Sequence, residues 1–371
     1  MTEAAVVQDE RVKRTPFATR LMRQPELGAI AGLVLMLIIL ALAQTKAGLF
    51  TVDGILGFME PAAQLGILAI GAALLMIGGE FDLSVGSMIA FAGFVFGACA
   101  VAFGMPGLLA VVAALLTAAA IGTINGLIVT RTHLPSFIVT LAFLFILSGL
   151  TLVGLKWATG STQLRGVGDA IDGGVIDYLF AGKAFGGFFQ WLGDMGLIAV
   201  HTRGTLEGQP RADGVPVSIL WFLGLAVLSS WVLNRTRIGN WIFAAGGDPN
   251  AARNSGVPVN AVKIGLFITT ATCATIVALL QVADLGSTDA TRGFLKEFEA
   301  IIAAVIGGCL LTGGYGSTIG ACFGAVIFGL VKFGIDYTDI DRDWFKVFLG
   351  GMLLLAVLFN NIIRKRMTGE R

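Results

Sequence analysis

Charged residues are scarce in this chain. Asp, Glu, Lys and Arg make up 13% of its 371 residues, about half of the roughly 25% that is typical of soluble domains. Hydrophobic residues reach 56%, and the mean hydropathy is +0.85. A soluble protein of this length could not bury so much apolar surface. The composition therefore disfavours water-soluble enzymes, disordered chains and nucleic-acid-binding proteins, and it predicts a polytopic membrane protein.

Residues of the kinds that carry chemistry are also few. The four cysteines lie in apolar stretches, which argues against a disulfide framework or a metal site. Gly182-Lys183 is followed by Ala184, so no Walker A motif is present there. No Ser/His/Asp arrangement, metal-ligand cluster or carboxylate pair at helical spacing stands out. We therefore expect no enzymatic activity and no cofactor or metal bound by this chain, although a membrane-embedded enzyme stays as an alternative.

Uncharged stretches between successive charged residues predict the membrane spans. A helix that crosses the bilayer needs about 20 apolar residues, and most of the stretches have room for one helix each. Two longer stretches are interrupted by glycine, near Gly104 and near Gly313, and each of these predicts two helices. The stretches are 27–45, 61–79, 83–130, 132–155, 214–234, 264–283, 300–331 and 347–363. The expected fold is all-α with about ten transmembrane helices over 27–363, and segment 300–312 is short enough to be re-entrant or tilted.

The distribution of Lys and Arg predicts which way the spans run. With the long segment 156–216 set aside, basic residues gather on the side that carries both chain ends, and the positive-inside rule assigns that side to the cytoplasm. We expect cytoplasmic tails at 1–26 and 364–371, a long periplasmic loop at 156–216 and a cytoplasmic loop at 235–263. The first apolar run is longer than the 7–15 residues of a signal peptide, so a retained first span is favoured over cleavage.

Ionisable side chains are expected to be missing from the middle of every predicted span. Proton-coupled and ion-coupled carriers usually place such groups at that depth. The pattern therefore disfavours a proton-driven carrier, but it does not exclude sodium coupling through backbone carbonyls. A stand-alone secondary carrier or facilitator for a neutral solute stays open as an alternative.

The loop at 235–263 predicts a short helix of about two turns. Asp248 can cap its start, Pro249 suits the first helical position, and Gly256 suits the residue just past its end. A compact helix with small residues is shaped to enter a groove on a partner protein. An ordinary loop between two spans is the alternative.

Four segments resemble the ribose-type, simple-sugar permease family of ABC importers, and they occur in the order of that family. They are Gly79-Glu-Phe-Asp-Leu-Ser-Val-Gly-Ser87, Asn125 to Thr140 with Leu134-Pro-Ser-Phe-Ile-Val-Thr140, Gly246-Gly-Asp-Pro-Asn-Ala-Ala-Arg253, and Ala300 to Ser317 with Gly313-Gly-Tyr-Gly-Ser317. Together they cover most of the chain from about 60 to 360. The resemblance implies the fold of the vitamin B12-type ABC importer permeases and a location in the bacterial inner membrane.

The same resemblance implies a function and a set of partners. We expect a permease subunit that carries a pentose, hexose or related polyol, with a second permease copy, a periplasmic sugar-binding protein and cytoplasmic ABC ATPase subunits that hold ATP and Mg. The residues expected to dock on the ATPase are Gly246, Gly247, Asp248, Pro249, Asn250, Ala251, Ala252, Arg253 and Gly256. The family motif at the cytoplasmic start of the third span contributes Gly79, Glu80, Asp82, Ser84, Gly86 and Ser87.

Roles within that motif follow from its position before a helix. Asp82 or Ser84 is expected to cap the third span, in preference to contacting sugar. Many family members have glycine where Glu80 stands, so no family role transfers to this acid. We hypothesise that Glu80 pairs with a basic residue of the ATPase.

Segment 156–216 is longer than the usual loop of the family. Its aromatic run from Phe185 to Leu192 predicts an interfacial helix on the outer leaflet, with contact to the binding protein as the alternative. Elsewhere, small residues spaced by four predict close helix packing. These pairs are Gly93 and Gly97, Gly122 and Gly126, and Gly320 and Gly324.

Overall fold

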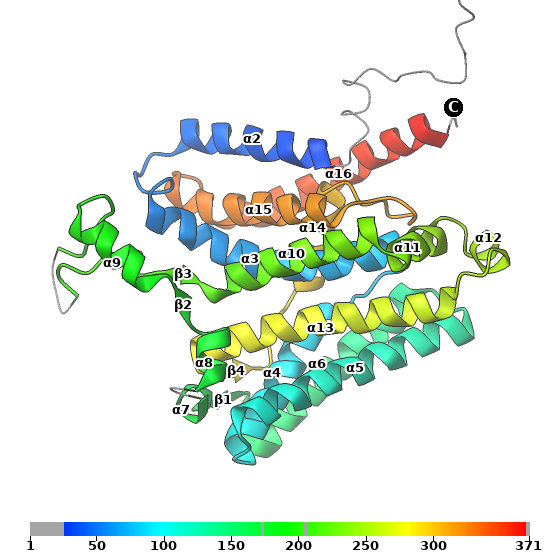
Figure 1. The fold of residues 1–371 in the computed structure, drawn as a ribbon, viewed down its shortest axis with the longest axis horizontal. Helices are drawn as coiled ribbons and strands as arrows, with labels where there is room; N and C mark the ends of the chain where they lie inside the picture. The colour runs from blue at the N-terminus through cyan, green and yellow to red at the C-terminus, as the bar shows by residue number, and fades with distance from the viewer. Residues whose placement is uncertain (1–25, 172–173, 203–205, 369–371) are drawn as a thin grey trace, which may run out of the picture.

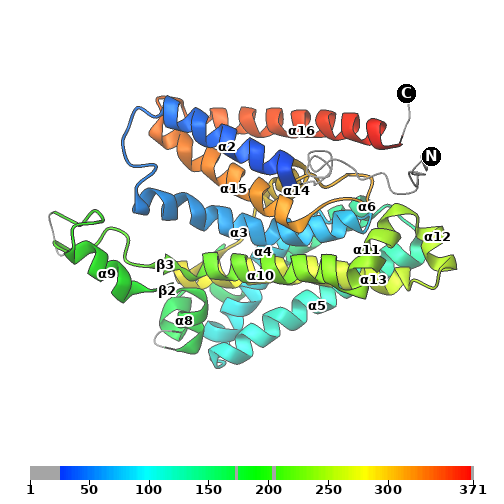
Figure 2. The ribbon, with the colours of Figure 1, turned by 45° about the horizontal axis from the view of Figure 1, so that its top comes forward.

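The computed structural model describes residues 26–171, 174–202 and 206–368. Long helices run side by side, with the short helix α12 at one end of the bundle and helix α9 at the other (Figures 1 and 2). We refer to these as the α12 end and the α9 end. The predicted tail at 1–26 lies outside the described residues apart from Glu26, as do the last residues of the tail at 364–371.

Each predicted span corresponds to one helix. The helices are α2 (Glu26–Ala43), α3 (Val52–Ile77), α4 (Val85–Gly97) with a π-helical turn at Ala98–Ala102, α5 (Gly107–Thr132), α6 (Ser136–Thr159), α10 (Val217–Arg235), α13 (Val259–Leu285), α14 (Lys296–Ile306), α15 (Thr318–Gly334) and α16 (Trp344–Thr368). Within the described ranges, eight of them are long and apolar enough to cross a membrane, all but α14 and α16. The prediction of an all-α polytopic membrane protein is confirmed.

Shorter elements occupy the loops. The segment after α6 contains β1 (Gln163–Arg165), α7 (Val167–Ile171), α8 (Val175–Phe180), β2 (Lys183–Ala184), α9 (Gly186–Asp194) and β3 (Val215–Pro216), and the rest are α11 (Arg237–Gly247), α12 (Pro249–Asn254), β4 (Ser287–Asp289) and a 3-10 turn at Ile335–Tyr337. β1 pairs with β4 and β2 with β3, both antiparallel. The aromatic run does form a helix, α9, on which the rings of Phe188 and Trp191 stack at 5.8 Å. Its place on the outer leaflet stays a prediction.

Helices α3 and α13 form the centre of the bundle, and both are buried along most of their length. Close packing around them depends on the predicted small residues. A Cβ at Gly122 or Gly126 of α5 would stand 2.6 or 2.7 Å from backbone Cα atoms of α13. These two glycines therefore let α5 and α13 approach until their backbones are in contact, as the spacing predicts.

The chain that leads from α3 into the third span is not helical near the α12 end, and we call it the broken start of the third span. After α3 ends at Ile77, residues 78–84 form a turn and a non-helical stretch, and α4 begins only at Val85. A non-helical backbone is tolerated inside a membrane protein only where other groups satisfy its N–H and C=O groups. The segment 78–84 is therefore a place where neighbouring helices must supply hydrogen bonds.

The eighth span is only partly helical, which explains why its uncharged run from Ala300 to the glycines at 313 and 314 is too short for a full membrane-spanning helix. Thr288 in β4 lies against Gly93 and Gly97 of α4, whereas Gly293 lies against Gly86. The chain thus runs beside α4, from the level of Gly97 and Gly93 to that of Gly86, in a non-helical stretch before the 11-residue helix α14 begins. The span is half non-helical and half helix, which replaces the re-entrant or tilted helix expected at 300–312.

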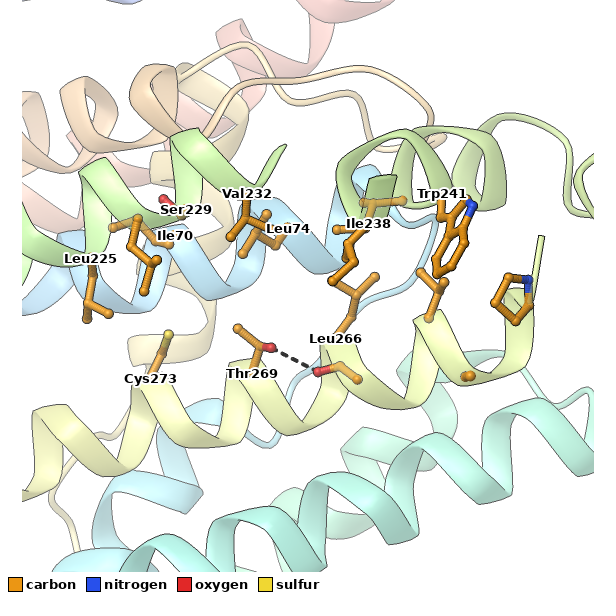
Figure 3. Close-up of a pocket in the computed structure, with 16 residues that line it drawn as sticks. Ile70, Leu74, Leu225, Ser229, Val232, Ile238, Trp241, Leu266, Thr269 and Cys273 are labelled. Carbon is orange, nitrogen blue, oxygen red and sulfur yellow. Dashed lines mark hydrogen bonds between the residues drawn. The ribbon is translucent and has the colours of Figure 1, made fainter. Parts of the chain in front are cut away.

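An apolar cavity of about 500 Å³ lies between α10, α11, α13 and α3. Figure 3 shows aliphatic side chains of these helices pointing into it, among them Leu225, Val232 and Leu266. The two hydroxyl groups in the lining, of Ser229 and Thr269, donate to carbonyls of their own helices. Both hydroxyl groups in the lining therefore already have a hydrogen-bond acceptor within the protein.

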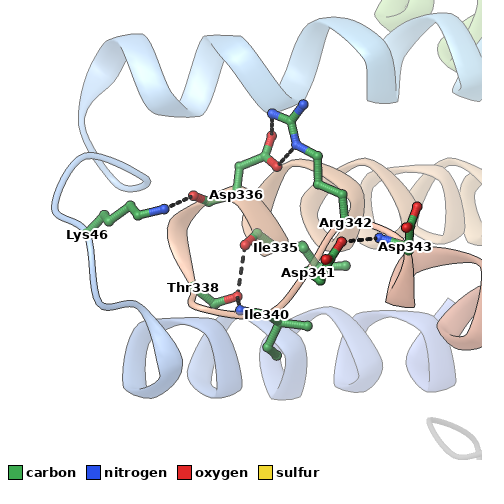
Figure 4. A network of polar contacts seen from close by, with 8 residues as sticks. All are labelled: Lys46, Ile335, Asp336, Thr338, Ile340, Asp341, Arg342 and Asp343. Atoms are coloured by element: carbon green, nitrogen blue, oxygen red, sulfur yellow. Dashed lines mark hydrogen bonds and ion pairs between the residues drawn. The ribbon is translucent and has the colours of Figure 1, made fainter.

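Polar contacts fasten two loops together at the α9 end (Figure 4). Arg342 binds both carboxylate oxygens of Asp336, and Lys46 donates to the Asp336 carbonyl at 3.3 Å. The backbone N–H of Thr45 donates to the carbonyl of Tyr337 at 2.9 Å. The turn between α2 and α3 is thereby held to the turn between α15 and α16.

Candidate functional site

The broken start of the third span is supported by hydroxyl groups of α6. The N–H of Phe81 donates to Ser136 Oγ at 3.0 Å, and the N–H of Leu83 donates to Thr140 Oγ1 at 3.0 Å. Ser136 and Thr140 are one helical turn apart, so the segment rises along α6 as it leaves the α12 end. This contact joins the first motif of the sequence to the second.

Asp82 shapes the turn before α4 and does not act as the predicted helix cap. Its Oδ1 accepts from the Ser84 N–H at 2.8 Å and from the Ser84 hydroxyl. Ser84 occupies the N-cap position, but its side chain makes no capping bond, because its hydroxyl is engaged by Asp82 and by Asn125 Nδ2 at 3.3 Å. The expectation that Asp82 or Ser84 caps the third span is therefore wrong. All three side chains are buried, and together they link α5 to the broken segment.

Glu80 has its partner within the chain. Its carboxylate forms an ion pair with the ammonium of Lys263 on α13, and the two side chains are only 11% and 14% exposed. A buried carboxylate that already has a cation beside it is poorly suited to pair with a basic residue of a second protein. The structure therefore replaces the hypothesis of an ATPase partner for Glu80 by an internal ion pair.

The short helix predicted in loop 235–263 is present as α12. Asp248 Oδ1 accepts from the N–H groups of Asn250 at 2.9 Å and Ala251 at 3.0 Å, Pro249 is in the first turn, and Gly256 has a φ of +83° just past the end. The predicted N-cap, proline position and glycine are thus confirmed. The guanidinium of Arg253 donates to Asn250 at 3.2 Å and to Asn260 at 3.4 Å.

Five glycines meet where α11, the end of α3 and the α14–α15 loop converge, and we call this contact the glycine junction. It consists of Gly79, Gly246, Gly247, Gly313 and Gly314. A Cβ at Gly246 would overlap the Ile77 carbonyl oxygen, and one at Gly313 would lie 2.8 Å from Gly79 Cα.

The Gly314 N–H also donates to the Ile77 carbonyl at 2.9 Å. The helix α11 that carries α12 is therefore in backbone contact with the end of α3, with Gly79 and with the α14–α15 loop. Three segments that are far apart in the sequence are joined here with no side chain between them.

Acidic side chains lie deeper in the bundle than the sequence indicated. Glu297 and Glu299 are in the first turn of α14 and are 4% and 8% exposed. Glu297 lies against Gly86 of α4, and Glu299 forms an ion pair with Lys296. The expectation of uncharged span interiors is therefore wrong at α14. The uncharged run at 300–331 begins only after Glu299, so it leaves out the non-helical first half of the span and the first turn of α14.

The predicted motif residues thus lie mainly at one end of the molecule. The motif at 79–87 contacts the second motif through Ser136, Thr140 and Asn125, and the glycine junction brings in the third and fourth. The structure adds Lys263, which lies outside all four motifs. Its charge at the start of an otherwise apolar helix was the signal in the sequence that could have identified it.

The α12 end is built from backbone contacts between glycines, one buried ion pair and hydroxyl groups that bind a non-helical stretch. Within the residues that the structure describes, no group of three or more His, Cys, Asp or Glu is placed to hold a metal ion. Broken spans packed against long helices, with a short helix presented on a loop, are features of membrane transport proteins. The fold and the site therefore define a polytopic transport protein.

Comparison with known proteins specifies the family. A family model described as a branched-chain amino acid transport system permease component matches residues 54–357. The chain belongs to this family of transport permease components. It is 31% identical to the ribose import permease protein RbsC of Escherichia coli (strain K12), over 89% of this chain and 92% of that protein.

A second relative is the xylose transport system permease protein XylH of Escherichia coli (strain K12). It is 30% identical over 87% of this chain and 88% of that protein. The ribose import permease protein of Haemophilus influenzae is 29% identical over 89% and 92%. The resemblance to ribose-type permeases is thereby confirmed, and a permease of this family is a transport subunit and not an enzyme.

No solved structure matches the chain. The likeness to the vitamin B12-type permease fold therefore stays a prediction from the sequence.

Proposed function

We propose that this chain is the membrane-spanning permease subunit of an ATP-driven, binding-protein-dependent importer that carries a sugar, a pentose, hexose or related polyol, across the bacterial inner membrane. The substrate class is supported by the relatives, which are a ribose import permease and a xylose transport system permease. The partners proposed are cytoplasmic ABC ATPase subunits, a periplasmic sugar-binding protein and a second permease copy. ATP and Mg belong to the ATPase, and this chain holds no cofactor.

The observation that carries the proposal is the backbone contact that joins α11, and through it α12, to the end of α3 and to the α14–α15 loop. α12 is capped by Asp248 and continues directly from α11, whose Gly246 touches the backbone at the end of α3 and in the loop before α15. A displacement of α12 would thus be passed through α11 to the end of α3 and to the α14–α15 loop. Rocking of packed helices about such a contact is a known way to alternate between two open states. We therefore assign α12 as the coupling helix that docks on the ATPase.

The orientation follows from that assignment. The α12 end faces the cytoplasm, and the α9 end, with segment 156–216, faces the periplasm. Arg235, Arg237 and Arg253 then lie on the cytoplasmic side, in keeping with the positive-inside rule. Both chain ends are placed in the cytoplasm on the same ground.

The experiment is reconstitution in proteoliposomes. The permease is assembled with the ATPase and the binding protein encoded beside it, and uptake of radiolabelled ribose, xylose and unrelated solutes is measured with and without ATP on the α12 side. We expect sugar uptake that needs all the components. Uptake by the permease alone, driven by an ion gradient or by the sugar gradient, would overturn the proposal.

One observation favours the second candidate, a stand-alone secondary carrier. Glu297 and Glu299 provide the buried carboxylates that such carriers use as relays. The variant Glu297→Gln separates the two functions, because a carrier would lose its ion dependence whereas an ATP-driven permease would keep its dependence on ATP.

A further inference from the structure

We propose that the apolar cavity between α10, α11, α13 and α3 is a binding site for one acyl chain of an anionic phospholipid, whose phosphate is held by Arg235 and Arg237. The volume of about 500 Å³ falls within the roughly 300–1,000 Å³ of specific small-molecule sites.

The lining selects an apolar occupant. Its side chains are aliphatic apart from one indole, one thiol and two hydroxyls, and both hydroxyls already donate to carbonyls of their own helices. A sugar or other hydroxylated ligand would therefore lose its water without gaining partners. A hydrocarbon chain has no polar group to desolvate when it enters.

The cavity is bordered by surface that is suited to lipid. Val227, Leu228 and Trp231 of α10 are 70%, 53% and 57% exposed beside it. At its α12 end stands Trp241, and Figure 3 shows its ring at the edge of the lined space. Tryptophan is enriched at the depth of lipid headgroups, where its ring is apolar on one side and wet on the other. An acyl chain in the cavity would thus run from headgroup depth at Trp241 toward the middle of the bundle.

Charge at the mouth selects an anionic headgroup. Arg235 ends α10 and Arg237 begins α11. In the sequence, both lie between Val232 and Ile238, which line the cavity. Both are exposed, and among the described residues neither guanidinium has an ion-pair partner. Basic residues at the membrane surface beside a cleft between helices attract the phosphates of anionic lipids. Two such residues on one turn can hold one phosphate between them.

The experiment measures retained lipid on the full-length permease. The purified protein is placed in nanodiscs of phosphatidylglycerol and phosphatidylethanolamine in equal amounts, transferred to detergent, and the lipid that remains bound is counted by native mass spectrometry. The variant Arg235→Gln/Arg237→Gln should weaken retention of phosphatidylglycerol on the order of tenfold. Arg131→Gln, which removes a charge at the α12 end of α5, is the control and should retain lipid as the wild type does.

A second variant tests the cavity itself. A Cβ at Gly265 meets nothing within 4 Å, and Gly265 lines the cavity, so Gly265→Phe fills it without a backbone clash. Gly149 on α6 is equally open and lies away from the cavity, so Gly149→Phe is the matched control. We expect Gly265→Phe to lose the retained lipid and Gly149→Phe to keep it, with both proteins unchanged in thermal unfolding.

Three outcomes would overturn the inference. Equal retention of the two lipids by the wild type would remove the headgroup assignment. Full retention by Gly265→Phe would place the lipid elsewhere on the protein. If Gly265→Phe instead splits a dimer into monomers in size-exclusion chromatography while lipid retention stays constant, the cavity belongs to the contact with a second copy of the chain.

Discussion

Lys263 and Glu80 form a buried ion pair between α13 and the broken start of the third span, although they are 183 residues apart in the sequence. Lys263 lies in the second turn of α13, a short way after α12. The pair therefore clamps the non-helical segment of 78–84 to the helix that follows the proposed coupling helix. Breaking it would leave one charge in a largely buried place.

Removal of one partner of this ion pair should destabilise the permease. Loss of one member of a buried pair costs roughly 3–5 kcal/mol, because the remaining charge is uncompensated. We expect Lys263→Met and Glu80→Gln each to lower the thermal unfolding midpoint of the purified permease, and the double variant to be less destabilised than the sum of the two. Additive effects in this double-mutant cycle would show that the two charges are not coupled.

Hydroxyl groups of α6 give a second prediction. Thr140→Val removes the acceptor for the Leu83 N–H, and an unsatisfied buried donor costs about 1–3 kcal/mol. Thr151 is the matched control, since it is fully buried on the same helix but donates only to the Leu147 carbonyl. We expect Thr140→Val to lower both the unfolding midpoint and sugar uptake in vesicles, and Thr151→Val to change neither appreciably. Equal losses in the two variants would assign the effect to helix packing.

The sequence predicted the helical part of this architecture well because apolar run length is a local property. It also predicted α12 correctly, since a capping aspartate, a proline and a glycine act on their nearest neighbours. It failed where the membrane-spanning chain is not helical. The descent beside α4 from Thr288 to Gly293 carries no local signal, because its backbone is accommodated by glycines nearly 200 residues away.

The sequence also does not indicate which side chains pair when they lie far apart along the chain. Glu80 departs from the glycine found in many family members, yet no spacing rule leads from it to Lys263. Ser84 looked like a helix cap, and only the fold shows that Asp82 and Asn125 engage its hydroxyl instead. Such pairings depend on which helices become neighbours, which a single sequence does not specify.

The cap of α12 gives a third prediction. Asp248→Ala removes the acceptor for two backbone N–H groups, and loss of a helix N-cap costs about 0.5–2 kcal/mol. Because α12 has only six residues, we expect this loss to weaken retention of the ATPase on the permease during co-purification and to reduce ATP-dependent uptake. Asp248→Asn keeps an acceptor and should retain most of both activities. An alanine variant that binds the ATPase as the wild type does would separate α12 from docking.

The glycine junction gives the sharpest contrast, because two adjacent residues differ completely in their surroundings. A Cβ at Gly246 would overlap the Ile77 carbonyl oxygen and stand 2.8 Å from the Gly314 nitrogen, whereas a Cβ at Gly247 meets only Gly314 Cα, at 4.0 Å. Overpacking a closely packed site costs typically 1–3 kcal/mol, and here the atoms that must move are backbone.

We expect Gly246→Ala to abolish sugar uptake, because it pushes α11 away from α3 and the α14–α15 loop, while Gly247→Ala stays close to the wild type. The permease should still reach the membrane in both variants, which surface labelling and size-exclusion chromatography check. ATPase activity separates a broken link from a broken fold. If Gly246→Ala uncouples the junction, the assembled complex still hydrolyses ATP but no longer responds to the loaded binding protein. Normal uptake by Gly246→Ala would mean that α11 transmits no movement to the end of α3 and the α14–α15 loop through this contact.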